Sequence, residues 1–190
     1  MITATTDQLE RAQRFLAGIP GAAERAMKAT LNEAIRRARV EALELIDERY
    51  EVAGADVKAR LSLQLARPSS LSATLRAKSP SLPLSYFPHA PSKPGTGGPG
   101  KPTLSATVLR GNTKDVGGAF VAQLGVKPRI VTRTGRKTAS GKDEMKVLYS
   151  VPIAEMLGVP NVALAVEARA LEVLDEALSA EIDRELGAVA

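Results

Sequence analysis

The chain has 190 residues, of which 44% are hydrophobic and 25% charged, a composition that indicates a folded, soluble protein with a single domain. It contains no cysteine and one histidine, His89, so disulfides, thiolate catalysis and metal sites made of cysteines or several histidines are excluded. The formal charge of +5 is unevenly distributed, because residues 55–148 hold 16 Lys and Arg against 4 Asp and Glu, whereas residues 149–190 hold 2 against 8.

Two helices are predicted over residues 6–50. Residues 6–18 form a short helix that Thr6 or Asp7 can cap. From Ala22 to about Tyr50, apolar residues recur at steps of mostly three and four, which is the stripe of a long amphipathic helix.

After Gly54 the apolar period changes from 3.6 to 2, which predicts a mostly antiparallel β region over residues 57–151. The expected strands cover residues 61–65, 71–77, 104–109, 119–124, 129–134 and 145–151. A Pro-, Gly- and Ser-rich loop interrupts them, with a brief ordered piece at 84–87 and a flexible part over 88–102. The last two strands are expected to pair across a polar tip, giving a basic hairpin over residues 129–151.

The chain is expected to close with a long helix over residues 161–187, capped by Asn161. Its apolar stripe comprises Leu164, Ala168, Leu171, Leu174, Leu178, Ile182 and Leu186. The predicted fold class is therefore α+β, a mostly antiparallel sheet or sandwich flanked by a long N-terminal and a long C-terminal helix, in one domain of residues 1–190.

Motifs for catalysis are weak in this sequence. The run Gly95–Lys101 fits seven positions of a phosphate-binding loop, but Pro102 stands where Ser or Thr should bind magnesium, and a Pro-rich loop precedes it in place of a strand. His89 has no acidic residue near it, since none occurs between Asp56 and Asp115. We therefore expect no enzymatic activity, no catalytic residues, no cofactor, no metal and no small-molecule substrate.

The basic hairpin is the candidate contact for a partner or for DNA. Its cations are Arg129, Arg133, Arg136, Lys137, Lys142 and Lys146. Because few aromatic residues lie among them, any DNA contact is expected at phosphates and without sequence preference. The last helix offers acids of opposite sign at Glu167, Glu172, Asp175, Glu176 and Asp183. Two simpler interpretations stay open: the cations are ordinary solvated surface, or the acidic C-terminal segment folds onto the basic one.

Short motifs, taken in order, resemble the minor tail protein Z family of long-tailed bacteriophages. They are Tyr50, Val57-Lys58, Leu61-Ser62-Leu63, Leu71-Ser72-Ala73-Thr74-Leu75-Arg76-Ala77, Pro83-Leu84-Ser85-Tyr86-Phe87, Gly118-Ala119-Phe120-Val121-Ala122 and Tyr149-Ser150-Val151-Pro152-Ile153. The similarity spans roughly residues 20–187. Two features depart from the family pattern, since no arginine precedes Pro152 and Gly158-Val159-Pro160 stands where members carry a Gly-Pro pair.

The resemblance implies a structural tail completion protein at the head-proximal end of the tail. Such a protein is expected to form a homo-oligomeric ring, with a hexamer favoured, to meet neck and tail proteins such as the tail terminator and the head–tail connector, and to support head–tail joining and DNA passage. It would assemble in the host cytoplasm and reside in the virion. The alternative is a DNA-binding or packaging accessory protein without sequence specificity. No membrane contact is expected, because no apolar run reaches the roughly 20 residues that span a bilayer.

Overall fold

A computed structural model describes residues 2–3, 6–78, 80–95 and 103–188. Helices and antiparallel sheets share the chain, so the predicted α+β class with long N-terminal and C-terminal helices is confirmed. The chain divides into two compact units, where the sequence predicted one domain. The first comprises Met1–Leu45, Lys58–Lys78 and Leu157–Ala190, and the second comprises Ile46–Val57 and Ser79–Met156.

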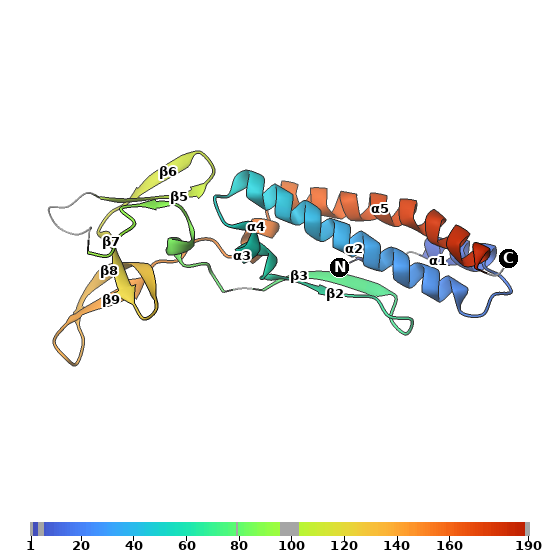
Figure 1. Cartoon of the computed structure of the whole chain (residues 1–190), viewed down its shortest axis with the longest axis horizontal. Coiled ribbons are helices and arrows are strands. Elements are labelled where there is room, and N and C mark those ends of the chain that lie inside the picture. The colour runs from blue at the N-terminus through green and yellow to red at the C-terminus, as the bar shows by residue number, and fades with distance from the viewer. Residues whose placement is uncertain (1, 4–5, 79, 96–102, 189–190) are drawn as a thin grey trace. The chain divides into compact units, whose positions relative to one another are not determined.

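The first unit is built on two long helices, α2 (Ala22–Arg49) and α5 (Pro160–Gly187), which lie side by side (Figure 1). The antiparallel strands β2 (Leu61–Gln64) and β3 (Ser72–Ala77) run along these helices, and β1 (Ile2–Thr3) pairs with the other edge of β3. The start of α2 and the positions of β2 and β3 agree closely with the predicted periodicity.

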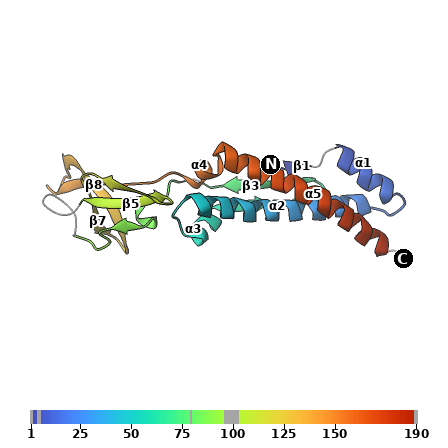
Figure 2. The same cartoon turned by 90° about the horizontal axis from the view of Figure 1, so that it is seen from above.

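A short helix, α1 (Thr6–Phe15), lies beside the C-terminal part of α5 (Figure 2). It ends earlier than the predicted boundary at residue 18. Half of the core between α1, α2 and α5 consists of alanines, and the other half of larger apolar residues: Ala12, Ala22, Ala23 and Ala26, with Leu16, Met27, Leu178 and Ile182. Alanines at such positions let helix axes approach closely.

The buried side of α5 differs from the predicted stripe. Leu174, Leu178 and Ile182 are buried as expected, whereas Leu164, Ala168, Leu171 and Leu186 are exposed. Their places in the core are taken by Val162, Val166, Ala170 and Val173. These residues also follow helical spacing, and their smaller side chains suit the close packing against α2. The predicted cap is wrong too: Val159 occupies the N-cap position without a side-chain bond, because Pro160 already starts the helix.

The second unit contains two three-stranded antiparallel sheets. The first has the order β4-β5-β6, formed by β4 (His89–Ala90), β5 (Leu104–Leu109) and β6 (Asn112–Val116). The second has the order β7-β8-β9, formed by β7 (Ala119–Leu124), β8 (Lys127–Lys137) and β9 (Asp143–Val147). In the described residues the strands thus form separate small sheets, because most pair with their neighbours in sequence.

Several short elements were not expected from the sequence. They are β1, β4, β6, α3 (Gly54–Lys58) and α4 (Ile153–Leu157). β6 is almost entirely polar and exposed, so it carries no alternation of apolar residues. The ordered piece expected at 84–87 is confirmed as a 3₁₀ turn, η1 (Leu84–Tyr86).

The loop predicted to be flexible over 88–102 is only partly described, since residues 96–102, including most of the phosphate-loop-like run, lie outside the described residues. Its first part is held by the sheets. The Thr107 N–H donates to the Pro88 carbonyl at 2.9 Å, and the Gly95 N–H donates to the Val121 carbonyl at 3.0 Å. The His89 Nδ1–H donates to the Phe87 carbonyl at 2.7 Å, so this imidazole stabilises the local chain.

Candidate functional site

The basic hairpin is formed by β8 and β9, which confirms the predicted pairing. Val131 lies opposite Val147, Arg133 opposite Met145 and Lys137 opposite Asp143, with an irregularity between Arg133 and Lys137. The second strand begins at Asp143 and ends at Val147, whereas the sequence predicted residues 145–151. At the tip, the Thr138 N–H donates to the Lys142 carbonyl at 2.8 Å, and Gly141 adopts a φ of +77° that favours glycine.

The base of the hairpin is fixed by apolar packing and by aromatic rings. Ile130 and Val131 are fully buried. The Arg133 guanidinium lies 4.7 Å from the centre of the Phe120 ring, and that of Arg129 lies 5.9 Å from the Tyr86 ring. These are cation–π distances, so the two arginines nearest the base stabilise the hairpin itself.

One carboxylate, Asp143, neutralises part of the cationic charge. The Lys137 ammonium donates to it at 2.5 Å, and the Arg133 guanidinium lies 3.2 Å from it. The hydrogen bond and the charge of Lys137, followed by the charge of Arg133, lower the pKa of Asp143 below its ordinary value. The second acid, Glu144, accepts a hydrogen bond from the Thr134 hydroxyl at 2.7 Å.

Three cations of the hairpin remain available for a partner. Arg136, Lys142 and Lys146 are exposed, and none of their side chains forms an ion pair with a described residue. Of the six predicted residues, two lie over rings, and one of these, Arg133, is also bridged to Asp143 together with Lys137; the other three face solvent. Exposed cations on a two-stranded ribbon can bind carboxylates or phosphates by charge, without contacts to bases.

The acids predicted on the last helix are all exposed on α5, but they also differ in their partners. Glu172 is paired with Arg169 at 2.5 Å, which raises the pKa of that arginine, and Asp175 accepts from the Gln8 amide at 3.0 Å. Within the described part of the chain, Glu167, Glu176 and Asp183 form no ion pair.

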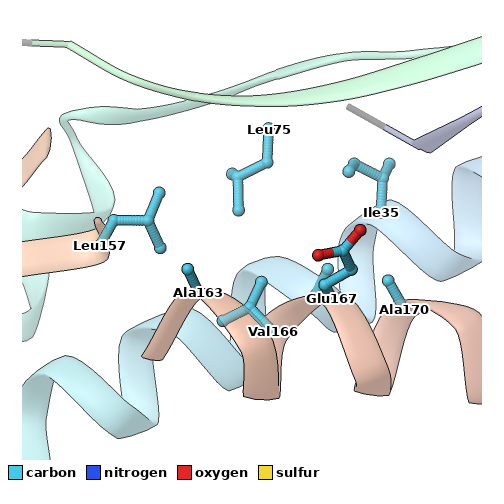
Figure 3. A pocket seen from close by; sticks show the side chains of 8 residues that line it. Ile35, Leu75, Leu157, Ala163, Val166, Glu167 and Ala170 are labelled. Atoms are coloured by element: carbon cyan, nitrogen blue, oxygen red, sulfur yellow. The ribbon is translucent and has the colours of Figure 1, made fainter. Parts of the chain in front are cut away.

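Glu167 borders an apolar hollow of about 220 Å³ in the first unit (Figure 3). The lining comes from α2, β3, α4 and α5, through Ile35, Ala38, Leu75, Leu157, Ala163, Val166, Glu167 and Ala170. The sequence pattern predicts Glu167 on the acidic face of the helix but does not predict this hollow. No local pattern indicates it, because its residues are brought together from four separate segments.

Comparisons with known protein families, curated proteins and solved structures find no match to this chain. Among the described residues, no group of three or more His, Asp or Glu side chains is placed to hold a metal ion. The described helices include none with both the length and the apolar character needed to cross a bilayer.

Proposed function

We propose that this protein is a structural component of a bacteriophage tail, which completes the head-proximal end of the tail by self-associating into a ring. The short motifs from Tyr50 to Ile153 supply the resemblance on which the phage assignment rests. The observation that supports self-association is the presence of unpaired charges of opposite sign on two elements, the β8–β9 hairpin and α5. No enzymatic step is part of the proposal.

Opposite charges on different parts of one chain favour head-to-tail contacts between identical copies. Such heterologous contacts close into a ring when the rotation between copies permits it. Each exposed ion pair contributes only ~0–1 kcal/mol, so the charges would orient the subunits while apolar contacts supply most of the affinity. A hexamer is the favoured assembly, and the tail terminator and head–tail connector are the expected neighbours.

The test is a charge reversal at the hairpin cations that face solvent. Changing Arg136, Lys142 and Lys146 to Glu should leave the chain folded by circular dichroism, yet reduce its incorporation into tails and the yield of infectious particles. Arg133 and Lys137 are left unchanged, because a carboxylate at either position would lie beside Asp143.

A matched control reverses three exposed cations of the first unit, Lys58, Arg67 and Arg76, whose side chains form no ion pair with a described residue. This control should assemble normally, since it carries the same change in net charge at another place. Normal incorporation and infectivity of the hairpin variant would refute the assignment of this surface to tail assembly.

DNA binding without sequence preference is the second candidate, because the same three cations could contact phosphates. Affinity for random duplex should then fall with salt, and the hairpin variant should flatten the slope of log K against log salt by about 2.7 for three lost contacts. Absence of binding at low salt would exclude this candidate without affecting the ring proposal.

A further inference from the structure

One side of α5 is covered over only part of its length. Leu164, Leu171 and Leu178 follow one another at seven-residue steps, so they lie on nearly the same side of the helix. Leu178 is buried in the cluster with α1, and the nearby Ser179 accepts a hydrogen bond from Arg11 of that helix. Leu171 and Leu164, beyond the reach of this packing, are 48% and 66% exposed. Beyond the cluster with α1, this side of α5 therefore presents an exposed apolar strip formed by Leu164 and Leu171.

The hollow and the open strip adjoin each other at Glu167. On α5 this residue lies angularly between the lining residues Val166 and Ala170 on one side and Leu164 and Leu171 on the other. Figure 3 shows its side chain reaching from α5 into the space near Ile35 and Leu75, among otherwise apolar groups. The surface is thus apolar with one central carboxylate, and it fits an aliphatic stem that ends in a cation.

We infer that this surface, formed by the hollow, Glu167, Leu164 and Leu171, is the docking site for the β8–β9 hairpin of a second copy of this chain. The hairpin has the complementary chemistry. Lys142 and Lys146 carry unpaired ammonium groups on long aliphatic stems, so each offers an apolar contact together with a positive charge. An apolar centre with charged groups at its rim is the usual composition of a specific protein interface.

This inference rests on the proposed self-association and specifies its contact. The two surfaces differ, so each copy would receive one hairpin and donate another, which is the heterologous arrangement that closes into a ring when the rotation between copies permits it. Glu176 lies further along α5 without an ion pair in the described chain, and it would help to attract the cations as the copies approach.

The direct test places a photo-cross-linking amino acid at position 164 of the full chain. Equal amounts of ordinary and nitrogen-15-labelled protein are mixed, so that mass spectrometry separates links between copies from links within one copy. We expect links between copies that end in the hairpin, over residues 127–147. Links confined to one copy, links that end elsewhere, or a chain that stays monomeric at the highest concentration reached would overturn the inference.

A charge exchange provides the second readout. Glu167→Lys and Lys146→Glu should each weaken self-association by about tenfold in sedimentation velocity, and an equal mixture of the two variants should restore it, because every contact can then join opposite charges. Glu10→Lys, at an exposed acid of α1 that belongs to neither proposed surface, should leave association unchanged. If Glu167→Lys behaves like this control, the docking inference is wrong, whereas the virion proposal is decided separately by incorporation of the hairpin variant into tails.

Discussion

Asn32 joins α2 to Ala66, two residues beyond the end of β2, by a pair of buried hydrogen bonds. The side chain is 7% exposed, and its Oδ1 accepts from the Ala66 N–H at 2.7 Å while its Nδ2 donates to the Ala66 carbonyl at 3.3 Å. One amide therefore satisfies both backbone groups of a buried residue. Asn32→Ala would leave these two groups without a partner inside the first unit.

The expected loss follows from the cost of an unsatisfied buried group, about 1–3 kcal/mol. Asn32→Ala leaves two such groups without a hydrogen bond, and water can partly satisfy the carbonyl. The expected loss of stability is therefore about 2–4 kcal/mol. For a chain of this length that corresponds to a decrease in Tm of about 4–16 °C. The neighbouring Glu33→Ala is the matched control, because its ion pair with Arg37 is exposed at both ends and is worth only about 0.3–0.5 kcal/mol.

Hydrogen exchange measured by mass spectrometry gives a readout for each unit. In Asn32→Ala, peptides from residues 22–45 and 61–77 should exchange faster, whereas peptides from the second unit should change little. Guanidinium unfolding should show a lower midpoint with an unchanged slope. If Asn32→Ala loses no more stability than Glu33→Ala, the two hydrogen bonds do not hold β2 to the helix, and the reasoning fails.

Three further outcomes are expected. Thr30→Val replaces a fully buried hydroxyl that has no hydrogen-bond partner in the described structure. This change should raise the free energy of unfolding by about 1 kcal/mol, and an unchanged denaturation midpoint would count against it. By NMR titration Asp143 should show a pKa below the ordinary value of an aspartate, and Lys137→Met should return the pKa toward that value. Because the pKa of Asp143 is lowered in the folded state, the stabilisation by this ion pair should be present above the unfolded pKa and lost as pH falls through the folded pKa. Loss of hairpin pairing on acidification from pH 7 to 5 would therefore contradict the assignment. Gly125→Ala, at a turn residue with φ of +67°, should lower the free energy of unfolding by about 1–2 kcal/mol. Gly54→Ala, at the start of α3, should be neutral or stabilising, and equal effects of the two changes would show that turn strain is not the cause.

Elements with a strong apolar period could be predicted from the sequence, and elements stabilised by their neighbours could not. The long run from Ala22 predicts α2 well, and the alternation after Leu61 predicts β2 and β3. The prediction of the buried side of α5 was wrong because the helix carries two apolar stripes, one rich in valine and one rich in leucine. Only the packing against α2 determines which of the two stripes is buried. β6 pairs with β5 through its backbone, so its polar side chains give no signal.

The candidate site, too, could be predicted from the sequence only in part. The six cations of the hairpin are visible in the sequence, but their roles depend on the register that places Asp143 opposite Lys137 and on the fold that brings Phe120 under Arg133. The hollow beside Glu167 depends on four segments that are distant in sequence. Such arrangements follow from tertiary packing, which periodicity does not encode.

The alanine-rich packing of the first unit has a consequence for how this sequence can change over time. Where Ala12, Ala22 and Ala26 are fully buried between helices, the permitted side chain is limited by volume and not by polarity alone. A larger aliphatic residue would be as hydrophobic as the site requires, yet overpacking typically costs about 1–3 kcal/mol. These positions should therefore accept glycine or serine more readily than valine or leucine in a mutational scan, which reverses the preference found in most apolar cores.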